Sequence, residues 1–225
     1  MVLKKVGLMV LVLFAAFVAF GYLLPKQVHV ERSIIVERPA SMMFTILNSY
    51  RYFSEWSPWA ARDTNAEFIV SGPVSGVGAR MSWIGDPRLV GSGWQEIVAS
   101  KPYEQIEFKL DFDAQGVANT GFTFQPHGEA TEITWSFDSN LTEGLGFVDA
   151  FLARYFGLLF DRWVGGDYEK GLVNLKQFAE SLPVSDFSQM QIDRVELTAQ
   201  NILFVTSSSS QDPQDIAAAM AAAYA

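Results

Sequence analysis

The sequence predicts an α+β fold: a curved antiparallel sheet closed by one long C-terminal helix and preceded by one transmembrane helix. Three observations lead to this prediction. A charge-free apolar run lies near the N-terminus, short segments of alternating apolar and polar residues follow it, and a long segment of helical periodicity comes last. The connections between the alternating segments are short, which favours antiparallel pairing because parallel strands need long crossovers.

The apolar run covers residues 6–24 and reads VGLMVLVLFAAFVAFGYLL. As a helix it would span about 28 Å, close to the hydrocarbon thickness of a bilayer. Tyr22 stands near its far end, where an amphipathic ring favours the membrane interface. We therefore interpret residues 1–27 as a transmembrane anchor.

The charges that flank this run predict the orientation of the anchor. Lys4 and Lys5 precede it and join the α-amino group as a basic cap. The positive-inside rule then places the N-terminus in the cytoplasm and the chain after Pro25 outside it, on the periplasmic side of a bacterial inner membrane. The alternative is a cleaved signal peptide, with Ala19 and Gly21 as small residues near a cleavage site.

The period of the sequence changes from helical to two at residue 28. Apolar residues alternate with polar ones at Val28, Val30, Ile34 and Val36, which predicts a strand with one buried face. Arg32 takes an inward position on this strand, so it needs a partner or a route to solvent. It could pair at the cavity mouth with an acidic ligand group or a nearby carboxylate, or it could extend along the rim to water.

A short apolar helix at 41–47 and an aromatic turn at 50–59 come next, and further strands follow. We expect these strands at 67–71, 79–84, 93–99, 105–112, 120–125 and 132–138. The segment 105–112 shows the clearest alternation, and Lys101-Pro102 and Pro126-His127-Gly128 have the composition of hairpin turns.

The long helical segment covers residues 147–181. Apolar residues fall at helical spacing at Val148, Leu152, Phe156, Leu159, Trp163, Leu172, Leu175 and Phe178. Gly165-Gly166 predicts a bend or a close approach to the sheet. A curved sheet closed by such a helix leaves a cavity between the two.

Aromatic residues make up 14% of the chain, with 18 Phe and 6 Trp, which is more than a plain core of this size requires. The expected strand registers place several rings on one face of the sheet, opposite rings of the long helix. A cavity lined by such rings suits flat aromatic or apolar ligands. The candidate ligand-binding residues are Arg32, Trp56, Trp59, Trp83, Phe108, Phe122, Phe124, Trp135, Tyr155, Phe156 and Trp163. Ordinary core packing by the same rings is the alternative.

Composition argues against several classes of function. The formal net charge is −9, which disfavours binding of nucleic acid. The chain has no Cys, and its two His residues, His29 and His127, fall on an outward strand position and in a turn. No nucleophile elbow, phosphate loop or His-Glu metal motif occurs. We therefore expect no catalytic residue, no metal and no cofactor.

Several short motifs resemble one known superfamily. They are Trp56-Ser57-Pro58-Trp59, Gly76-Val77-Gly78-Ala79-Arg80 with Trp83, Gly91-Ser92-Gly93, Thr131-Glu132-Ile133-Thr134-Trp135 and Gly166-Asp167-Tyr168-Glu169-Lys170-Gly171-Leu172. Together they resemble a bacterial branch of the START-like superfamily, also labelled polyketide cyclase/dehydrase-like or SRPBCC. The resemblance covers residues 28–182 and implies a helix-grip fold with a hydrophobic ligand cavity. It does not imply one reaction, because members include binders, carriers and a few cyclases.

Residues 183–225 form a third part of the chain. A linker, a strand, a Ser-rich loop and an Ala-rich helix with Asp212 as N-cap and Pro213 after it resemble the opening of a gyrase-inhibitor-like effector-binding domain. Such domains repeat this unit, and one strand with one helix cannot bury a core. We therefore expect that the chain is cut short after Ala225 or that the tail packs on the body, and a chance match to the effector-binding family is the third alternative.

Three functions are compatible with these patterns. The first is non-catalytic, membrane-anchored binding or sensing of a hydrophobic or aromatic small molecule, such as a lipid. The second is a cyclase- or hydrolase-like enzyme, which the lack of His, Cys or paired carboxylates in the expected cavity disfavours. The third is a structural role with a filled core. A cavity of a few hundred cubic ångströms would separate the first from the third.

Overall fold

The computed structural model describes residues 2–113 and 116–183, and within these ranges it describes the side chains from Lys4 onward. The expectations for the tail at 183–225 therefore lie almost wholly outside the described residues. The elements are, in order, α1 (Val2–Leu23), β1 (Gln27–Val36), α2 (Ala40–Leu47), α3 (Phe53–Trp56), α4 (Pro58–Arg62), β2 (Glu67–Ser71), β3 (Arg80–Ile84), β4 (Ser92–Lys101), β5 (Gln105–Asp111), β6 (Val117–His127), β7 (Ala130–Asn140), α5 (Phe147–Phe160), the π-helical turn η2 (Asp161–Gly165) and α6 (Gly166–Ser181).

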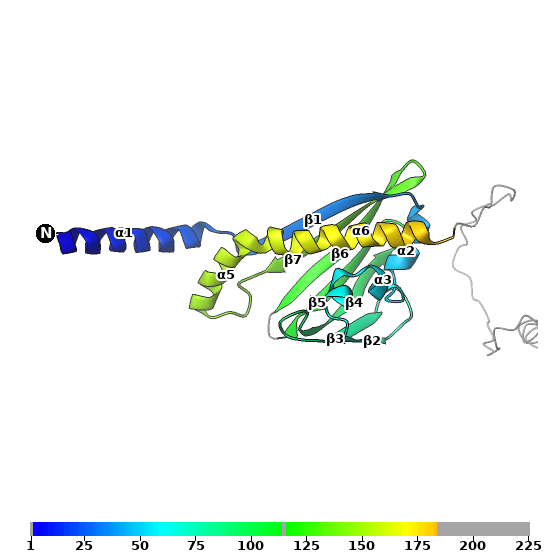
Figure 1. The fold of residues 1–225 in the computed structure, drawn as a ribbon, viewed down its shortest axis with the longest axis horizontal. Coiled ribbons are helices and arrows are strands. Elements are labelled where there is room, and N and C mark those ends of the chain that lie inside the picture. The colour runs from blue at the N-terminus through cyan, green and yellow to red at the C-terminus, as the bar shows by residue number, and fades with distance from the viewer. Residues whose placement is uncertain (1, 114–115, 184–225) are drawn as a thin grey trace, which may run out of the picture. The chain divides into compact units, whose positions relative to one another are not determined.

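The strands form one antiparallel sheet in the order β1-β7-β6-β5-β4-β3-β2, which confirms the predicted architecture (Figure 1). After β1, each strand pairs with the next one in sequence, as short connections require. Strand β1 instead pairs with β7, the last strand of the sheet along the chain. This pairing places the first and the last strands side by side.

The predicted alternation is seen most clearly in β5. Ile106, Phe108 and Leu110 are buried, whereas Glu107 and Lys109 between them are exposed. Because successive side chains of a strand point to opposite faces, one face of the sheet is apolar and the other is exposed to solvent. Helix α6 lies on the apolar face, where it contacts β1, α3 and α4.

The predicted single helix at 147–181 is divided in two. The π-helical turn η2 separates α5 from α6 and ends within the Gly165-Gly166 pair where a bend was expected, and α5 turns out of the line of α6 (Figure 1). Helix α6 buries Tyr168, Leu172 and Leu175, whereas α5 has no buried residue. A π-turn of this kind re-aims the helix that precedes it.

The expectation that rings in the first half of the long segment face the aromatic residues of the sheet is therefore wrong. The α5 and η2 side chains in the apolar stripe of this half are 43–64% exposed; they are Val148 (64%), Leu152 (43%), Phe156 (58%), Leu159 (46%) and Trp163 (52%). Helical periodicity identified an apolar face correctly but could not tell what covers that face.

Helix α1 contains one segment, Lys4–Leu23, that is long and apolar enough to cross a membrane. This agrees with the helix predicted from the charge-free run. Its orientation and its retention in the mature chain stay predictions.

A cavity on the inner face of the sheet

A cavity of about 370 Å³ lies between the inner face of the sheet and the helices. That volume is within the range usual for small-molecule sites. The lining is largely apolar and comes from α3, α4, α5, η2, α6 and every strand except β1. Its residues are Phe53, Trp59, Arg62, Phe68, Met81, Trp83, Pro87, Leu89, Val90, Gly91, Gln95, Leu110, Phe112, Gly116, Val117, Ala118, Phe137, Ser139, Leu141, Phe160, Val164, Asp167 and Tyr168.

The sheet contributes a row of neighbours to the cavity wall. Gln95 on β4 stands opposite Leu110 on β5, which stands opposite Ala118 on β6. These directly opposed residues share one face, so all three reach the cavity. Ala118 and Ser139 are small, and their size leaves the room that larger side chains would fill.

Trp83 forms one fixed wall of the cavity. It stands opposite Gly93 in the β3–β4 pair, and a Cβ atom at Gly93 would lie 2.7 Å from Cζ2 of the indole. Glycine at this position thus leaves space for the ring. The indole Nε1 donates to the Val90 carbonyl at 3.2 Å, and the ring meets Phe112 edge to face. The Gly91-Ser92-Gly93 motif was the sequence signal for this arrangement, although its link to Trp83 could not be deduced.

Helix α4 supplies the polar end of the cavity. Ser57 accepts a hydrogen bond from the Ala60 amide, and Pro58 occupies the first turn, so the helix begins just before Trp59. Trp59 and Arg62 are three residues apart and share a face of the helix. Both reach Asp167 of α6: Arg62 pairs with one carboxylate oxygen, and Trp59 Nε1 donates to the other at 3.2 Å.

The Arg62–Asp167 pair was missed by sequence reasoning because 105 residues separate its members. Among the described residues that line the cavity, they are the only two with formal charges, and each neutralises the other. A ligand would therefore meet a neutral polar patch here and an apolar surface elsewhere.

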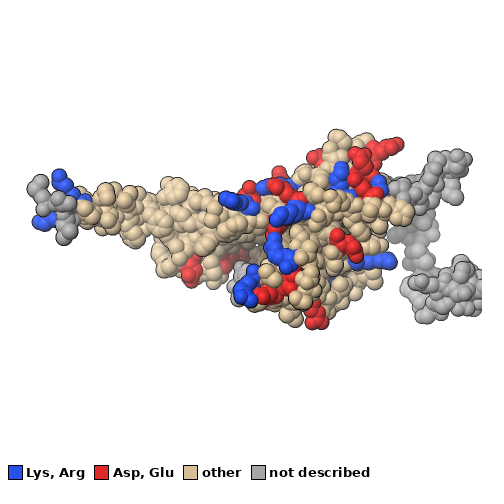
Figure 2. Space-filling model, in the orientation of Figure 1, with Lys and Arg blue, Asp and Glu red and all other residues tan. Residues whose placement is uncertain are grey.

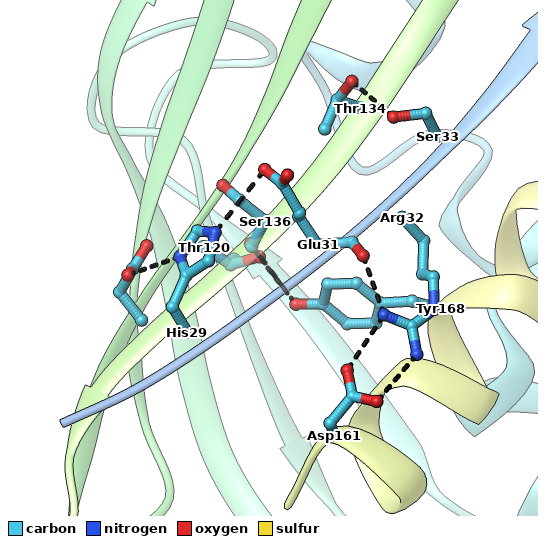
Figure 3. A network of polar contacts seen from close by, with 10 residues as sticks. His29, Glu31, Arg32, Ser33, Thr120, Thr134, Ser136, Asp161 and Tyr168 are labelled. Atoms are coloured by element: carbon cyan, nitrogen blue, oxygen red, sulfur yellow. Dashed lines mark hydrogen bonds and ion pairs between the residues drawn. The ribbon is translucent and has the colours of Figure 1, made fainter. Parts of the chain in front are cut away.

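Tyr168 lies at the floor of the cavity and is fully buried. Its ring stacks on Trp135 at a centroid distance of 3.8 Å, and its hydroxyl lies 2.8 Å from Thr120 Oγ1. Figure 3 shows this hydroxyl directed at the strands that carry Thr120 and Ser136. Burial raises the pKa of the Tyr168 hydroxyl, so the group is neutral at physiological pH.

The five predicted aromatic residues on strands share the inner face of the sheet, as expected, but four of them do not line the cavity. Of the eleven candidates, Trp59 and Trp83 do so. Five others form a packed group next to it, which we call the aromatic cluster: Trp56, Phe108, Phe122, Phe124 and Trp135. Trp56, Phe108, Phe122 and Trp135 pack against one another beside a void of about 20 Å³, and Phe124 packs edge to face on Phe44 of α2.

Arg32 faces inward, as its strand position predicted, and of the alternatives considered for it, the structure shows pairing with nearby carboxylates of the chain. Its Nη1 and Nη2 donate to both oxygens of Asp161 at 2.9 and 3.1 Å (Figure 3). Its Nε donates to Glu169 at 2.7 Å. The guanidinium holds the pKa of the Asp161 carboxyl below its ordinary value. Arg32 thus joins β1 to η2 and α6 and is not among the cavity residues.

Tyr155, Phe156 and Trp163 do not face the strand aromatics, contrary to expectation. Phe156 and Trp163 are exposed on the outer side of α5 and η2, and Tyr155 packs against Phe17 of α1. The reason is the π-helical turn, which directs α5 away from the sheet. Cavity residues on this side, such as Phe160 and Val164, come instead from the opposite face of the same turns.

Comparisons with known proteins agree with this architecture. A family model described as "Polyketide cyclase / dehydrase and lipid transport" matches residues 27–180. A protein of unknown function from Staphylococcus aureus, SA2116, has a similar structure, with a TM-score of 0.51, 11% identity, and coverage of 74% of this chain and 99% of that chain.

The di-domain ARO/CYC StfQ from the steffimycin biosynthetic pathway is similar over 68% of this chain and 51% of its own, with a TM-score of 0.50 and 17% identity. No curated protein matches this chain. At such identities the structural likeness shows the fold alone, and that fold is the helix-grip predicted from the sequence motifs.

Proposed function

The chain belongs to the polyketide cyclase / dehydrase and lipid transport family, and from this premise we propose that it is a membrane-anchored protein that binds a hydrophobic or aromatic small molecule without chemical change. The fold itself is one that binds hydrophobic ligands. The anchoring, the absence of catalysis and the site residues are our own proposal.

One observation carries the proposal, namely an apolar cavity of about 370 Å³ in an otherwise tightly packed body. Protein interiors are close-packed, and a void of this size forfeits dispersion contacts unless something occupies it. Its walls are mostly apolar, with Trp59 and Trp83 as flat ring surfaces. An occupant with an apolar or aromatic body would recover those contacts.

The polar groups of the cavity favour binding over catalysis. General acid–base catalysis uses groups whose pKa lies near the working pH. Arg62 and Asp167 are engaged with each other, and burial raises the pKa of the Tyr168 hydroxyl, which moves it away from neutrality. In this proposal one polar group of the ligand accepts a hydrogen bond from Arg62 or donates one to Asp167.

We place the body on the periplasmic side of a bacterial inner membrane, held by α1 with its N-terminus in the cytoplasm. Lys4 and Lys5 before the apolar segment support this orientation. The chain contains no Cys, so a single introduced thiol reports unambiguously on sidedness. Val77→Cys, at an exposed position, should react in intact cells with a maleimide that crosses the outer but not the inner membrane. Labelling only after the inner membrane is opened would overturn the orientation.

The binding proposal is tested on the full chain in lipid nanodiscs, since detergent could itself fill the cavity. We expect a hydrophobic compound to be enriched in organic extracts of the protein, as measured by mass spectrometry against empty nanodiscs. Ala118→Phe, which places a ring in the cavity, should remove most of that enrichment. Ile69→Phe is the matched control, because Ile69 is exposed on β2 and its neighbour Phe68 faces the cavity.

Two results would count against the proposal. If the wild type shows no enriched compound and no saturable binding of an added apolar probe such as 1-anilinonaphthalene-8-sulfonate, the binding function fails. If the bound compound is converted to a product and Asp167→Asn abolishes that conversion, the non-catalytic part fails and a cyclase- or hydrolase-like enzyme replaces it.

A further inference from the structure

Helix α5 and the following turn η2 carry an exposed apolar stripe that neither the core nor the cavity uses. Its five residues follow one another at spacings of four, four, three and four and so form one face; they are Val148, Leu152, Phe156, Leu159 and Trp163. Figure 2 shows a largely uncharged surface over α1 and the adjoining α5, whereas charges gather over the rest of the body. Within α5 itself, only Asp149 and Arg154 are charged.

Helix α5 packs directly against α1. The Tyr155 ring stacks on Phe17 at 4.5 Å, and Phe151 meets the same ring edge to face at 5.6 Å. Gly21 allows this approach, because a Cβ atom there would lie 2.3 Å from Cε2 of Phe151 and 2.8 Å from the Tyr155 ring. The two helices thus meet through aromatic side chains over a glycine.

The distance between this contact and the end of α1's apolar segment shows which part of α1 lies beside α5. Phe17 stands six residues before Leu23, the end of the apolar segment, which corresponds to about 9 Å along the helix axis. The Tyr155 hydroxyl donates to the Phe17 carbonyl, so this contact is well inside the segment. A membrane that accommodates all of α1 must therefore accommodate the adjoining part of α5 as well.

Arg154 contacts the C-terminal end of the apolar segment of α1. Its Nη1 donates to the Tyr22 carbonyl at 3.0 Å and to the Leu24 carbonyl at 3.3 Å, and its guanidinium lies near the Tyr22 ring. Arginine and tyrosine together are typical of the headgroup region, where the charge reaches water and the apolar parts stay in lipid.

We propose that α5 is an interfacial helix whose apolar stripe inserts into the outer leaflet of the bilayer beside α1. The inference rests on the membrane anchoring proposed above. Helices of this kind lie in the interface plane with the apolar face buried to about 5–10 Å. That depth matches the position of Phe17 within α1.

Such insertion also narrows the class of ligand. Leu159 belongs to the stripe, whereas the next residue, Phe160, lines the cavity. One turn of the chain therefore contacts lipid on one side and the cavity on the other. A ligand that partitions into the bilayer could then enter beside Phe160 without crossing bulk water.

The driving force would be apolar area and not charge. The chain has a formal net charge of −9, so anionic lipid would repel it, and α5 offers one acidic and one basic residue. Insertion should therefore occur in zwitterionic phosphatidylcholine and should not depend on salt.

The test uses single-cysteine variants of the full chain, reconstituted in phosphatidylcholine vesicles that contain nitroxide groups on the lipid acyl chains. Leu152→Cys and Leu159→Cys carry an environment-sensitive nitrobenzoxadiazole label on the stripe. Val173→Cys is the matched control, since Val173 is a helical residue of the same exposed fraction as Leu159, 46%. We expect acyl-chain quenching at least twofold stronger at positions 152 and 159 than at 173, and iodide quenching in the reverse order.

Three outcomes would overturn the proposal. Iodide could quench positions 152 and 159 as strongly as 173, which would place the stripe in water. Both labels could be shielded from iodide without lipid quenching, which would mean that a second copy of the chain covers the stripe. Insertion could require anionic lipid or vanish in high salt, which would contradict the apolar mechanism.

The role of α1 is tested by a matched pair of glycine variants. Gly21→Leu should displace the Phe151 ring and reduce lipid quenching at position 152, whereas Gly7→Leu should not, because a Cβ atom at Gly7 meets nothing within 4 Å. Equal quenching in both variants would show that α1 does not position α5. Ligand enrichment is measured separately, so insertion without a ligand refutes only the binding function, and a ligand without insertion refutes only this inference.

Discussion

The two ends of the sheet's inner face are built from the same strands but are filled in different ways. At one end Phe122 stands opposite Trp135, and Tyr168 stacks on the indole from α6. At the other end the same β6 presents Ala118 to the cavity, and β7 presents Ser139. The packed end and the hollow end thus differ in side-chain size on a shared backbone.

This difference indicates what each end does. Large interlocking rings remove area from water and stabilise the fold, whereas small residues beside rigid rings leave a defined space. Substitutions at the aromatic cluster should therefore change the free energy of unfolding, and substitutions around the cavity should change ligand binding. The predictions that follow test this division.

The largest effect is expected for Trp135→Ala. Trp135 contacts Trp56, Trp59, Phe122 and Tyr168, and it donates a hydrogen bond to Thr120, so its removal leaves a large hole. We expect the free energy of unfolding to fall by about 3–5 kcal/mol, measured by chemical denaturation of the full chain in nanodiscs with circular dichroism. Trp94→Ala is the control, because Trp94 is half-buried beside Arg80 and should cost about 1 kcal/mol. Equal costs for the two would refute the special role of the cluster.

The next prediction compares two buried alanines. Ala79→Leu enlarges a residue of the close-packed core and should cost about 1–3 kcal/mol of unfolding free energy. Ala118→Leu enlarges a residue at the cavity and should cost under about 1 kcal/mol, because the added atoms enter open space. Thermal denaturation of both variants checks the difference. A larger cost at Ala118 would mean that the hollow end is not hollow in solution.

The sequence predicted the strands of the sheet, but it could not predict which end of the inner face is packed and which end contains the cavity. The alternation in β5 and the inward position of Arg32 depend on local period, and both were predicted correctly. The position of the cavity depends on where a small residue lies opposite large ones across the inner face. Here the small residue is Ala118 on β6 and one of the large ones is Trp83 on β3, two strands that are not adjacent. No local pattern contains that information.

The prediction that the first half of the long helical segment faces the sheet was wrong for a different reason. The stripe from Val148 to Trp163 has the periodicity of a buried helix face, and a membrane interface and a protein core require the same pattern. The only local sign was the nearly complete absence of charge over α5. Similarly, nothing near Arg32 in the sequence indicated that Asp161 and Glu169, far along the chain, would be its partners.

A smaller effect is expected at Trp83, which belongs to the hollow end. Trp83→Ala removes a cavity wall but leaves the aromatic cluster intact, so binding should weaken by about tenfold, equivalent to about 1.4 kcal/mol. The free energy of unfolding should change less than in Trp135→Ala, because Trp83 is only half-buried. Titration with the enriched ligand gives the first quantity and denaturation gives the second. If Trp83→Ala destabilises the chain as much as Trp135→Ala and leaves binding unchanged, the division of roles is wrong.

The smallest effect concerns the outer face of the sheet, where His29 of β1 stands opposite Asp138 of β7. The hydrogen bond from His29 Nδ1 to Asp138, at 2.8 Å, raises the pKa of the imidazole above its ordinary value of 6.5. A raised pKa in the folded state means that the folded chain holds this proton more tightly than the unfolded chain does. The stabilisation is therefore complete below pH 6.5 and is lost as the pH rises through the folded-state pKa. His29→Gln should lower the stability slightly at pH 5.5 and not at pH 9, and Asp138→Asn should reduce that difference, because Glu31 at 3.4 Å from His29 Nε2 also raises the pKa of the imidazole. Because the described residues that line the cavity include no His, ligand affinity should stay constant over the same pH range, and an affinity that follows the His29 titration would show that the two faces are coupled.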